Sequence, residues 1–395
     1  MTVQFCRRCV ISNARPSSVV AWQRKPGDVS PTLAFNADGV CNACEYQEIM
    51  DTEIDWEARE AALHDLASQA RSKCGNFDVV VPGSGGKDSM FTSHVLKHRF
   101  GLTPLCVTAA PMMYTDVGWR NLQHWYSDNT GILVTPNQRV HRMLTRFAFL
   151  NTVYPFSPFV LQQRIAGPAQ SVLHGIPIVM YGESPAVYAG PIAENYESRM
   201  QERFYAGDPS PEAITLGGVS GSELMSKHGL NAQELKPYLP IDPEKLRAAG
   251  TECHYLSFYL KYHQQSAYYA AQEAYGFECA EERTSGSYSK YSSIDDKLDV
   301  LHYLCGYILF ALGRASYDAA QEIRTGVITR DEGVSLVKQF DHEIPRRYLA
   351  ECLGYMGITE AAFWDRLDRA RPDHLWQKRD DGIWRLKHSV YGDAP

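Results

Sequence analysis

Four of the ten cysteines stand in two pairs that have the spacing of a metal-binding knuckle. Cys6 and Cys9 form the first Cys-x-x-Cys pair, and Cys41 and Cys44 form the second. A two-residue gap lets both sulfurs of a pair turn toward one ion, so two pairs supply the tetrahedral four-sulfur shell of a structural zinc site. The 31 intervening residues exceed the usual spacing of about 15–20 and are rich in turn formers, which indicates an inserted loop. Unligated thiols and an iron–sulfur cluster are the alternatives.

A glycine-rich loop lies between an apolar run and a segment with helical periodicity. Residues 77–81 are apolar and β-branched, as in a buried strand, and residues 90–96 have apolar positions at helical spacing. Residues 84–89 read Ser-Gly-Gly-Lys-Asp-Ser. This order points backbone N–H groups and a helix N-terminus at an anion. The Walker A and Gly-x-Gly-x-x-Gly patterns both fail at Asp88, where they require a hydroxyl residue and a glycine respectively.

The loop resembles the PP-loop of the ATP pyrophosphatase superfamily, whose members cleave ATP between the α and β phosphates. By this resemblance, small or hydroxyl-bearing residues cradle the pyrophosphate: Ser84, Gly85, Gly86 and Ser89. Lys87 would neutralise charge on the leaving pyrophosphate, and Asp88 would help to place magnesium. A glycine-rich turn without a ligand is the alternative.

Further apolar runs predict the remaining strands of a doubly wound parallel α/β sheet. These runs are residues 105–108, 132–134 and 176–181. Ligands of such sheets bind at the carboxyl ends of the strands. We therefore expect Thr108 and Gly182 to contact the nucleotide, and Glu183 to contact magnesium or substrate. A carboxylate that begins a helix is the alternative for Glu183.

A segment rich in serine and tyrosine adds lysine and carboxylates nearer the C-terminus. If Ser293 caps a helix, Asp295 and Asp299 fall on one face of it. Paired carboxylates beside lysines suit a magnesium–phosphate site, and Lys290 has the reach of a mobile point charge toward ATP phosphates. An acidic first turn that favours the helix dipole is the alternative. The residues predicted to be catalytic are Lys87, Asp88, Glu183, Lys290, Asp295 and Asp296.

Other polar residues are weaker candidates. A cationic group at Arg139, His141 and Arg142 faces either an anionic substrate or solvent. The C-terminal tail reads as helices, and its exceptions to a purely structural role are Arg314, Asp318 and Arg324. In this tail, Thr329 begins a capping box, and Thr359 opens a helix that we expect to stop near Pro372.

Composition narrows the class of protein. The chain has 39 basic and 46 acidic residues, and its formal charge of −7 weighs against a protein that coats nucleic acid. Apolar residues at 44% and charged residues at 22% are typical of globular proteins. There is no leader pattern at the N-terminus and no apolar run of the roughly 18 residues that a membrane span needs. With six cysteines scattered singly, we expect a soluble cytoplasmic protein.

The patterns divide the chain into four predicted parts. A four-cysteine zinc module occupies residues 1–50, and a linker helix occupies residues 51–74. A nucleotide-binding domain follows at residues 75–250, with a polar insertion at 190–250 that is either a lid, a partner-binding loop or a surface excursion. A mainly helical, tyrosine-rich domain at residues 251–395 is expected to complete the active site.

The whole pattern resembles the N-acetyl sugar amidotransferase family, to about residue 370. Besides the paired cysteines and the loop, the resemblance rests on residues 114–119, 181–183, 286–297 and 313–318. It implies conversion of a sugar acetamido group to an acetamidino group with ATP, Mg²⁺ and ammonia, beside a structural Zn²⁺, in bacterial surface-polysaccharide or nonulosonic-acid pathways. It also implies a separate glutaminase that supplies ammonia, with a cyclase-like companion, and no nucleic acid. The chain departs from the family at residues 184–190 and in its longer loop between the cysteine pairs.

Two other classes of function remain open. A PP-loop enzyme that thiolates tRNA would perform the same adenylation with sulfur as the nucleophile, although the chain has no stripe of lysine and arginine. A scaffold that keeps only the zinc module for docking partners would leave the loop without a role.

Overall fold

A five-stranded parallel sheet forms the centre of the computed structural model, which describes residues 2–16, 21–23, 25–28, 32–73, 77–184 and 196–392. The strand order is β3-β2-β1-β4-β7. The strands are β1 (Val79–Pro82), β2 (Pro104–Ala109), β3 (Thr130–Val134), β4 (Ile178–Tyr181) and β7 (Glu252–Tyr255). The first four confirm the predicted strands. The pattern does not predict β7, because its Glu-Cys-His-Tyr sequence is short and mixes polar with apolar residues.

Helices cover both faces of this sheet, because alternate strand residues enter two different hydrophobic cores. On one face, Val80, Leu105 and Val179 pack with α5 (Gln138–Thr152) and α6 (Ser157–His174). The opposite face presents Val79, Val81, Cys106 and Met180 to α2 (Trp56–Lys73), α3 (Lys87–His98), α4 (Asp116–Ser127) and α11 (Gln264–Tyr275). The sheet is therefore doubly wound, as predicted, and its strand order reverses between β1 and β4.

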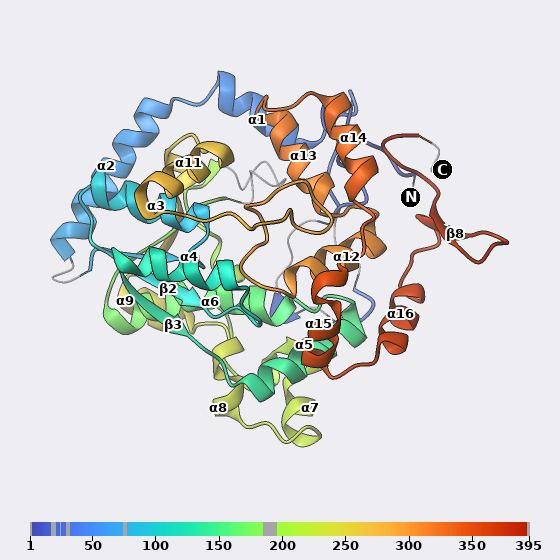
Figure 1. Ribbon diagram of the computed structural model, residues 1–395. Helices are drawn as coiled ribbons and strands as arrows, with labels where there is room; N and C mark the ends of the chain where they lie inside the picture. The colour runs from blue at the N-terminus through green and yellow to red at the C-terminus, as the bar shows by residue number, and fades with distance from the viewer. Residues whose placement is uncertain are drawn as a thin grey trace.

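The described part of the predicted insertion is folded and packs on the outer side of α5 and α6. It contains a hairpin of β5 (Thr215–Leu216) and β6 (Val219–Ser220), then α7 (Gly221–Ser226), α8 (Ala232–Leu235) and α9 (Pro243–Ala249). Leu216, Leu224 and Leu235 share one core with Leu144 and Leu161 of α5 and α6. Figure 1 shows α7 and α8 projecting at the edge of the molecule farthest from α1. Residues 190–195 of the insertion lie outside the described residues, as does Cys74.

The N-terminal module packs against the C-terminal helices. Its α1 (Asn42–Thr52) lies beside α13 (Arg314–Arg324) and α14 (Arg330–Phe340) in Figure 1. The four paired cysteines share a core with Ala319, Ala320 and Val337 of those helices. The Arg330 guanidinium also donates to the Cys6 carbonyl oxygen over 3.4 Å. The two ends of the chain therefore support one another.

The remaining C-terminal elements confirm part of the helical prediction. They are α10 (Leu256–Tyr259), α12 (Asp299–Phe310), α15 (Arg346–Met356), α16 (Glu360–Asp368) and the hairpin of β8 (Trp376–Lys378) and β9 (Trp384–Leu386). Thr329 forms the predicted capping box, and Thr359 caps α16, which ends at Asp368 before the expected stop. The predicted cap at Ser293 is wrong, because α12 begins at Asp299. Among the described residues, no helix is both long and apolar enough to cross a bilayer.

Candidate functional site

The four paired cysteines gather in one buried cluster. All four sulfurs lie within 4.8 Å of one another. Cys6 Sγ lies 3.9 Å from Cys44 Sγ, and Cys9 Sγ lies 3.7 Å from Cys41 Sγ. Four sulfurs around zinc at about 2.3 Å form a tetrahedron with edges of about 3.8 Å. The measured spacing fits such an ion, so the predicted ligand set has the geometry to hold a metal such as zinc.

The backbone around this cluster favours the thiolate form of Cys6. The N–H groups of Arg8, Cys9 and Cys41 point at Cys6 Sγ over 3.3 to 3.5 Å. The Cys41 thiol, followed by Cys44 and Cys9, lowers the pKa of Cys6. All four ligand positions are filled by the protein, so a metal here would hold the module together and leave no place for a substrate.

The glycine-rich loop begins at the carboxyl end of β1 and leads into α3. Gly85 adopts φ +80°, and a Cβ atom there would lie only 2.7 Å from the Leu122 Cα of α4. Glycine is therefore required at this position for two reasons, backbone conformation and space. Gly86 precedes α3 without a side-chain cap, so the first N–H groups of the helix remain available to an anion.

The loop forms one wall of a cavity whose other walls come from distant parts of the chain. The loop residues are Ser84, Gly85, Gly86, Lys87 and Asp88. The facing residues include Gly118 and Asn121 of α4, then Gln264, Phe277, Tyr291, Ser292, Ser293, Ile294, Asp295, Asp299 and Arg314. Of the predicted catalytic residues, Lys87, Asp88 and Asp295 therefore line one cavity. This cavity lies where the strand order reverses, which is the usual ligand position in such sheets.

Carboxylates that follow the two strands flanking this reversal are linked through one tyrosine. The Tyr262 hydroxyl contacts the Asp88 carboxylate and lies 2.9 Å from Glu183 Oε1. On its other oxygen, Asp88 accepts a hydrogen bond of 2.6 Å from Lys87 Nζ, which is almost fully buried and lies 6.0 Å from the Tyr291 ring centroid. The arrangement places a cation and two carboxylates beside the exposed end of α3, as a polyphosphate–metal ligand would require.

Three of the predicted nucleotide contacts do not line the cavity. The Ser89 hydroxyl donates to the Gly86 carbonyl oxygen over 3.0 Å. Thr108 is fully buried and accepts a hydrogen bond of 2.7 Å from the Tyr126 hydroxyl. Gly182 lies against the first turn of α3, where a Cβ atom would approach Thr92 Oγ1 to 2.9 Å. These residues lie behind the loop and support its shape.

Two further predicted catalytic residues make other contacts. Lys290 is exposed, and its ammonium donates to the Glu281 carbonyl oxygen over 2.9 Å. Asp296 is buried and accepts backbone hydrogen bonds from Met112 over 2.6 Å and from Leu298 over 2.8 Å. Burial raises the pKa of Asp296 to about 8, against the effect of those two N–H groups. Asp296 thus ties the segment before α12 to the loop after β2.

The cavity instead contains Asp299 and Arg314 at the starts of two helices. Asp299 begins α12 and Arg314 begins α13. Burial raises the pKa of Asp299 to about 6, and the Arg314 guanidinium opposes this rise. Arg314 Nε lies 3.0 Å from Asp318 Oδ1, and its guanidinium also contacts the Tyr303 hydroxyl. Arg314 is therefore a second cation that lines the cavity besides Lys87, and its contacts with Asp318 and Tyr303 hold it in place.

The cationic group on α5 lies away from this cavity. His141 is fully buried, with Nδ1 2.7 Å from the Tyr238 hydroxyl, and burial lowers its pKa to about 4. Arg139 pairs with Glu234 of the insertion, and Arg142 lies over the Tyr355 ring at 5.1 Å. Because His141 is buried against Tyr238 and is neutral near pH 7, it does not face an anionic substrate as a cation.

Two of the residues that the sequence reasoning missed follow the unpredicted strand, and a third lies on α4. Tyr262 and Gln264 come shortly after β7, and Asn121 lies on α4. If residues 252–255 had been recognised as a fifth parallel strand, the residues after it would have been expected at the carboxyl ends of the strands, beside the loop after β1. Asn121 pairs with the backbone of Glu278 through two hydrogen bonds of 2.8 and 2.9 Å, a contact between distant segments that no local pattern indicates.

The C-terminal residues that line the cavity lie in a region that matches a known protein family. Residues 285–391 match a protein family described as "LPS biosynthesis protein WbpG-like, C-terminal domain". Tyr291, Asp295, Asp299 and Arg314 all lie in the matched region. A search of curated proteins found no match for the chain. The similarity links the C-terminal part of this chain to proteins of lipopolysaccharide biosynthesis.

Proposed function

We propose that the chain is an ATP-dependent, AMP-forming amidotransferase that converts the acetamido group of an N-acetyl sugar to an acetamidino group in lipopolysaccharide biosynthesis. One observation carries the proposal. A loop of PP-loop sequence lines a cavity together with residues of the region that matches a lipopolysaccharide biosynthesis family. The loop supplies the nucleotide chemistry, and the matched region connects that chemistry to a sugar pathway.

The loop has the groups that a triphosphate tail needs. Backbone N–H groups at the start of α3 would bind phosphate oxygens, because they lack partners within the helix. Lys87 would neutralise the pyrophosphate as negative charge develops on it, with Arg314 as a second cation that lines the same cavity. Asp88, Asp295 and Asp299 carry the oxygen ligands that would hold Mg²⁺, which would screen the phosphates when bound.

The proposed reaction overcomes the low reactivity of an amide. The acetamido carbonyl oxygen attacks the α phosphorus of ATP, and the bond to pyrophosphate breaks. After the amide N–H proton is lost, the product is an O-adenylyl imidate. Ammonia then adds to the imidate carbon, and AMP leaves with the former carbonyl oxygen, so the carbon ends as an amidine. The protein's task is to align the two substrates and to exclude water, which would regenerate the amide.

The other parts of the chain have supporting roles in this proposal. The cysteine module at residues 1–50 would hold a structural zinc, residues 51–74 would link it to the nucleotide-binding part at 75–250, and residues 251–395 would complete the site. We propose that a separate glutaminase, with a cyclase-like companion, delivers the ammonia.

Mass spectrometry tests the reaction directly. Purified protein is incubated with ATP, Mg²⁺, ammonium and a panel of free and nucleotide-linked N-acetyl sugars. We expect a product with the mass change for replacement of O by NH, together with AMP and pyrophosphate. The Lys87→Met variant is the matched negative control. Formation of ADP, or AMP release without change in any sugar, would contradict the proposal.

A further inference from the structure

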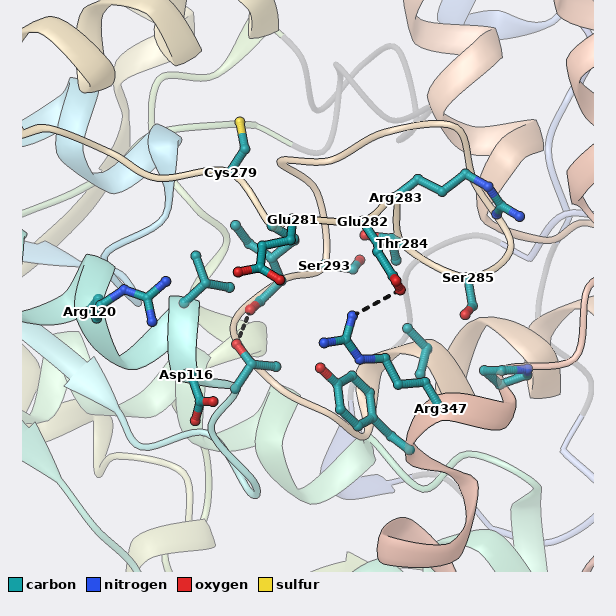
Figure 2. A pocket seen from close by; sticks show the side chains of 17 residues that line it. Asp116, Arg120, Cys279, Glu281, Glu282, Arg283, Thr284, Ser285, Ser293 and Arg347 are labelled. Atoms are coloured by element: carbon teal, nitrogen blue, oxygen red, sulfur yellow. Dashed lines mark hydrogen bonds and ion pairs between the residues drawn. The ribbon is translucent and has the colours of Figure 1, made fainter.

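A second cavity adjoins the one at the loop. Ser293 and Ile294 line both cavities, so one stretch of backbone separates them. The second cavity is bounded by the start of α4, by residues 279–285 and by residues 345–348 at the start of α15. Figure 2 shows Asp116 and Arg120 on one side of this cavity and Arg347 on another. The segment from Cys279 to Ser285, which has no regular secondary structure, passes above them. The loop residues 84–88 do not line it.

The arginine side chains of the second cavity are paired with carboxylates. Arg347 Nη1 lies 3.3 Å from Glu282 Oε2, as Figure 2 shows. Arg283 is 2.6 Å from Glu343, and Arg120 is 2.9 Å from Glu278. Because each lining arginine already has an acidic partner, the cavity has no excess of cations for a polyphosphate. Alternating donors and acceptors suit a neutral, hydroxyl-rich molecule better.

The backbone that separates the cavities is unusual at one residue. Ser293 has φ +56°, which is uncommon for a residue other than glycine. Its hydroxyl lies near enough to Asp299 to lower the pKa of that carboxyl. It nevertheless has no hydrogen-bond partner of ordinary geometry in the described part of the chain and is closed off from solvent. Strained backbone and unsatisfied polar groups of this kind are concentrated at ligand-binding sites.

We propose that the second cavity binds the acceptor sugar, an N-acetylated pyranose, with its acetamido group directed past Ser293 and Ile294 into the loop cavity. This inference rests on the proposed function. The ring hydroxyls contact the paired side chains near Arg347 and Arg120, and the acetamido oxygen meets the nucleotide beside Ser293 and Ile294, the two residues that line both cavities. The two substrates therefore have separate entrances and one meeting point, and the N-acetyl sugar is recognised mainly by residues that the nucleotide does not touch.

Cys279 provides a measurement of occupancy that does not depend on turnover. Cys279 is a lining residue of the second cavity and is partly exposed, whereas the other described cysteines are buried. Alkylation of Cys279 by iodoacetamide is followed by peptide mass spectrometry. The probes are N-acetylglucosamine, its UDP form, CMP-N-acetylneuraminate, glucosamine and ATP with Mg²⁺. We expect at least one acetamido sugar to slow alkylation, while glucosamine and ATP with Mg²⁺ do not. The carrier that protects best identifies the form of the acceptor.

A pair of arginine variants makes the test specific. Arg347→Leu removes a donor from the second cavity, and Arg369→Leu removes one from an exposed pair with Asp365 on α16. We expect Arg347→Leu to raise the sugar concentration that protects Cys279 from alkylation by about ten-fold or more, and to raise the KM for the sugar by a similar factor. The reason is that the substitution deletes a charged hydrogen bond. The KM for ATP should not change, and Arg369→Leu should behave as the unaltered protein.

The outcomes separate this inference from the proposed function. Amidine formation with an unchanged sugar KM in Arg347→Leu would overturn the sugar site and leave the function standing. Protection by an acetamido sugar without AMP formation would support the site and contradict the function. Equal protection by ATP with Mg²⁺, or no protection by any sugar of the panel, would overturn the inference.

Discussion

The cysteine cluster takes its four sulfurs from two short segments, whereas the loop cavity takes its walls from the turn after β1, from α4 and from residues between 264 and 314. In the cluster every ligand position is filled by the protein, and the sulfurs are buried. In the cavity, Lys87, Asp295 and Arg314 surround a space that the chain leaves open. A closed shell contributes to folding, and an open one is available for chemistry.

The two regions are connected by α13. Arg314 at the first residue of this helix lines the cavity, while Ala319 and Ala320 farther along pack under the cysteine module. The module therefore supports a helix that presents a cation to the cavity. The comparison predicts that damage to the cluster spreads to the cavity, whereas damage to the cavity leaves the cluster intact.

The largest expected effect follows removal of the metal or of one ligand. Zinc binding contributes about 10–16 kcal/mol to the folding of isolated zinc-finger peptides, so Cys44→Ser or a strong chelator should unfold the N-terminal module. We also expect lower activity in the assay of the proposed reaction, because α13 loses its support. Metal analysis should give one zinc per chain before treatment, and calorimetry should show a lower Tm after it. A metal-free protein with unchanged Tm would contradict the structural role.

A smaller effect, confined to the cavity, is expected from Lys87→Met. The variant should lose about a hundred-fold or more in kcat of the proposed reaction, since it removes the charge that would lie beside the leaving phosphates. Lys290→Met is the matched control, because the Lys290 ammonium contacts the Glu281 carbonyl on the surface. The zinc content of both variants should equal that of the unaltered protein. Equal losses of kcat in the two variants would contradict a special role for Lys87, the lysine that lines the cavity.

Asp296 gives a pH-dependent difference in stability. Its pKa of about 8 in the folded protein lies above the ordinary value of 3.8, because burial favours the neutral form. The folded state therefore binds more protons than the unfolded state between about pH 4 and 8, and stability falls as pH rises through this window. Relative to Asp296→Asn, the unaltered protein should lose at most about 1.4 kcal/mol per pH unit.

Urea unfolding of both proteins from pH 5.5 to 8.5 measures this difference. Titration of the cysteine cluster affects both proteins equally, so it cancels in the comparison. A gap that stays constant with pH would mean that the backbone N–H groups of Met112 and Leu298 keep Asp296 ionised in the folded protein.

The smallest expected effect comes from the cap of α14, which supports the cysteine module. Thr329→Ala removes a side chain that accepts from the Glu332 N–H and should cost about 1 kcal/mol of stability. Thr359→Ala on α16 is the matched control, since α16 does not share the core of the cysteines. We expect both to lower Tm by a few degrees and only Thr329→Ala to speed zinc loss to a chelator. Equal rates of zinc loss in the two variants would show that α14 does not stabilise the cysteine cluster.

Much of the fold follows from local pattern. Apolar runs predict β1, β2 and β4, because parallel strands buried on both faces are mostly apolar. The caps at Thr329 and Thr359 are predicted because a hydroxyl at the first turn satisfies N–H groups of the same turn. The polar strand β7 escapes such reasoning, since its burial depends on β4 beside it.

In the candidate site, too, some residues follow from local pattern and others are placed by contacts between distant segments. The positions of Lys87 and Asp88 follow from the loop that carries them. Lys290 and Asp296 belong to a segment without regular secondary structure, whose side chains are directed by contacts with Glu281 and Met112. No periodicity in the sequence specifies those contacts.

The sequence by itself indicated the two cysteine pairs, the phosphate-type loop and the four apolar strands, because each of these patterns spans only a few positions along the chain. The tertiary structure decided that Tyr262 links Asp88 to Glu183, that Arg314 rather than Lys290 lines the cavity, and that Ser293 lies between two cavities. Those features require segments far apart in sequence to meet, and only the packing of the helices on the sheet brings them together.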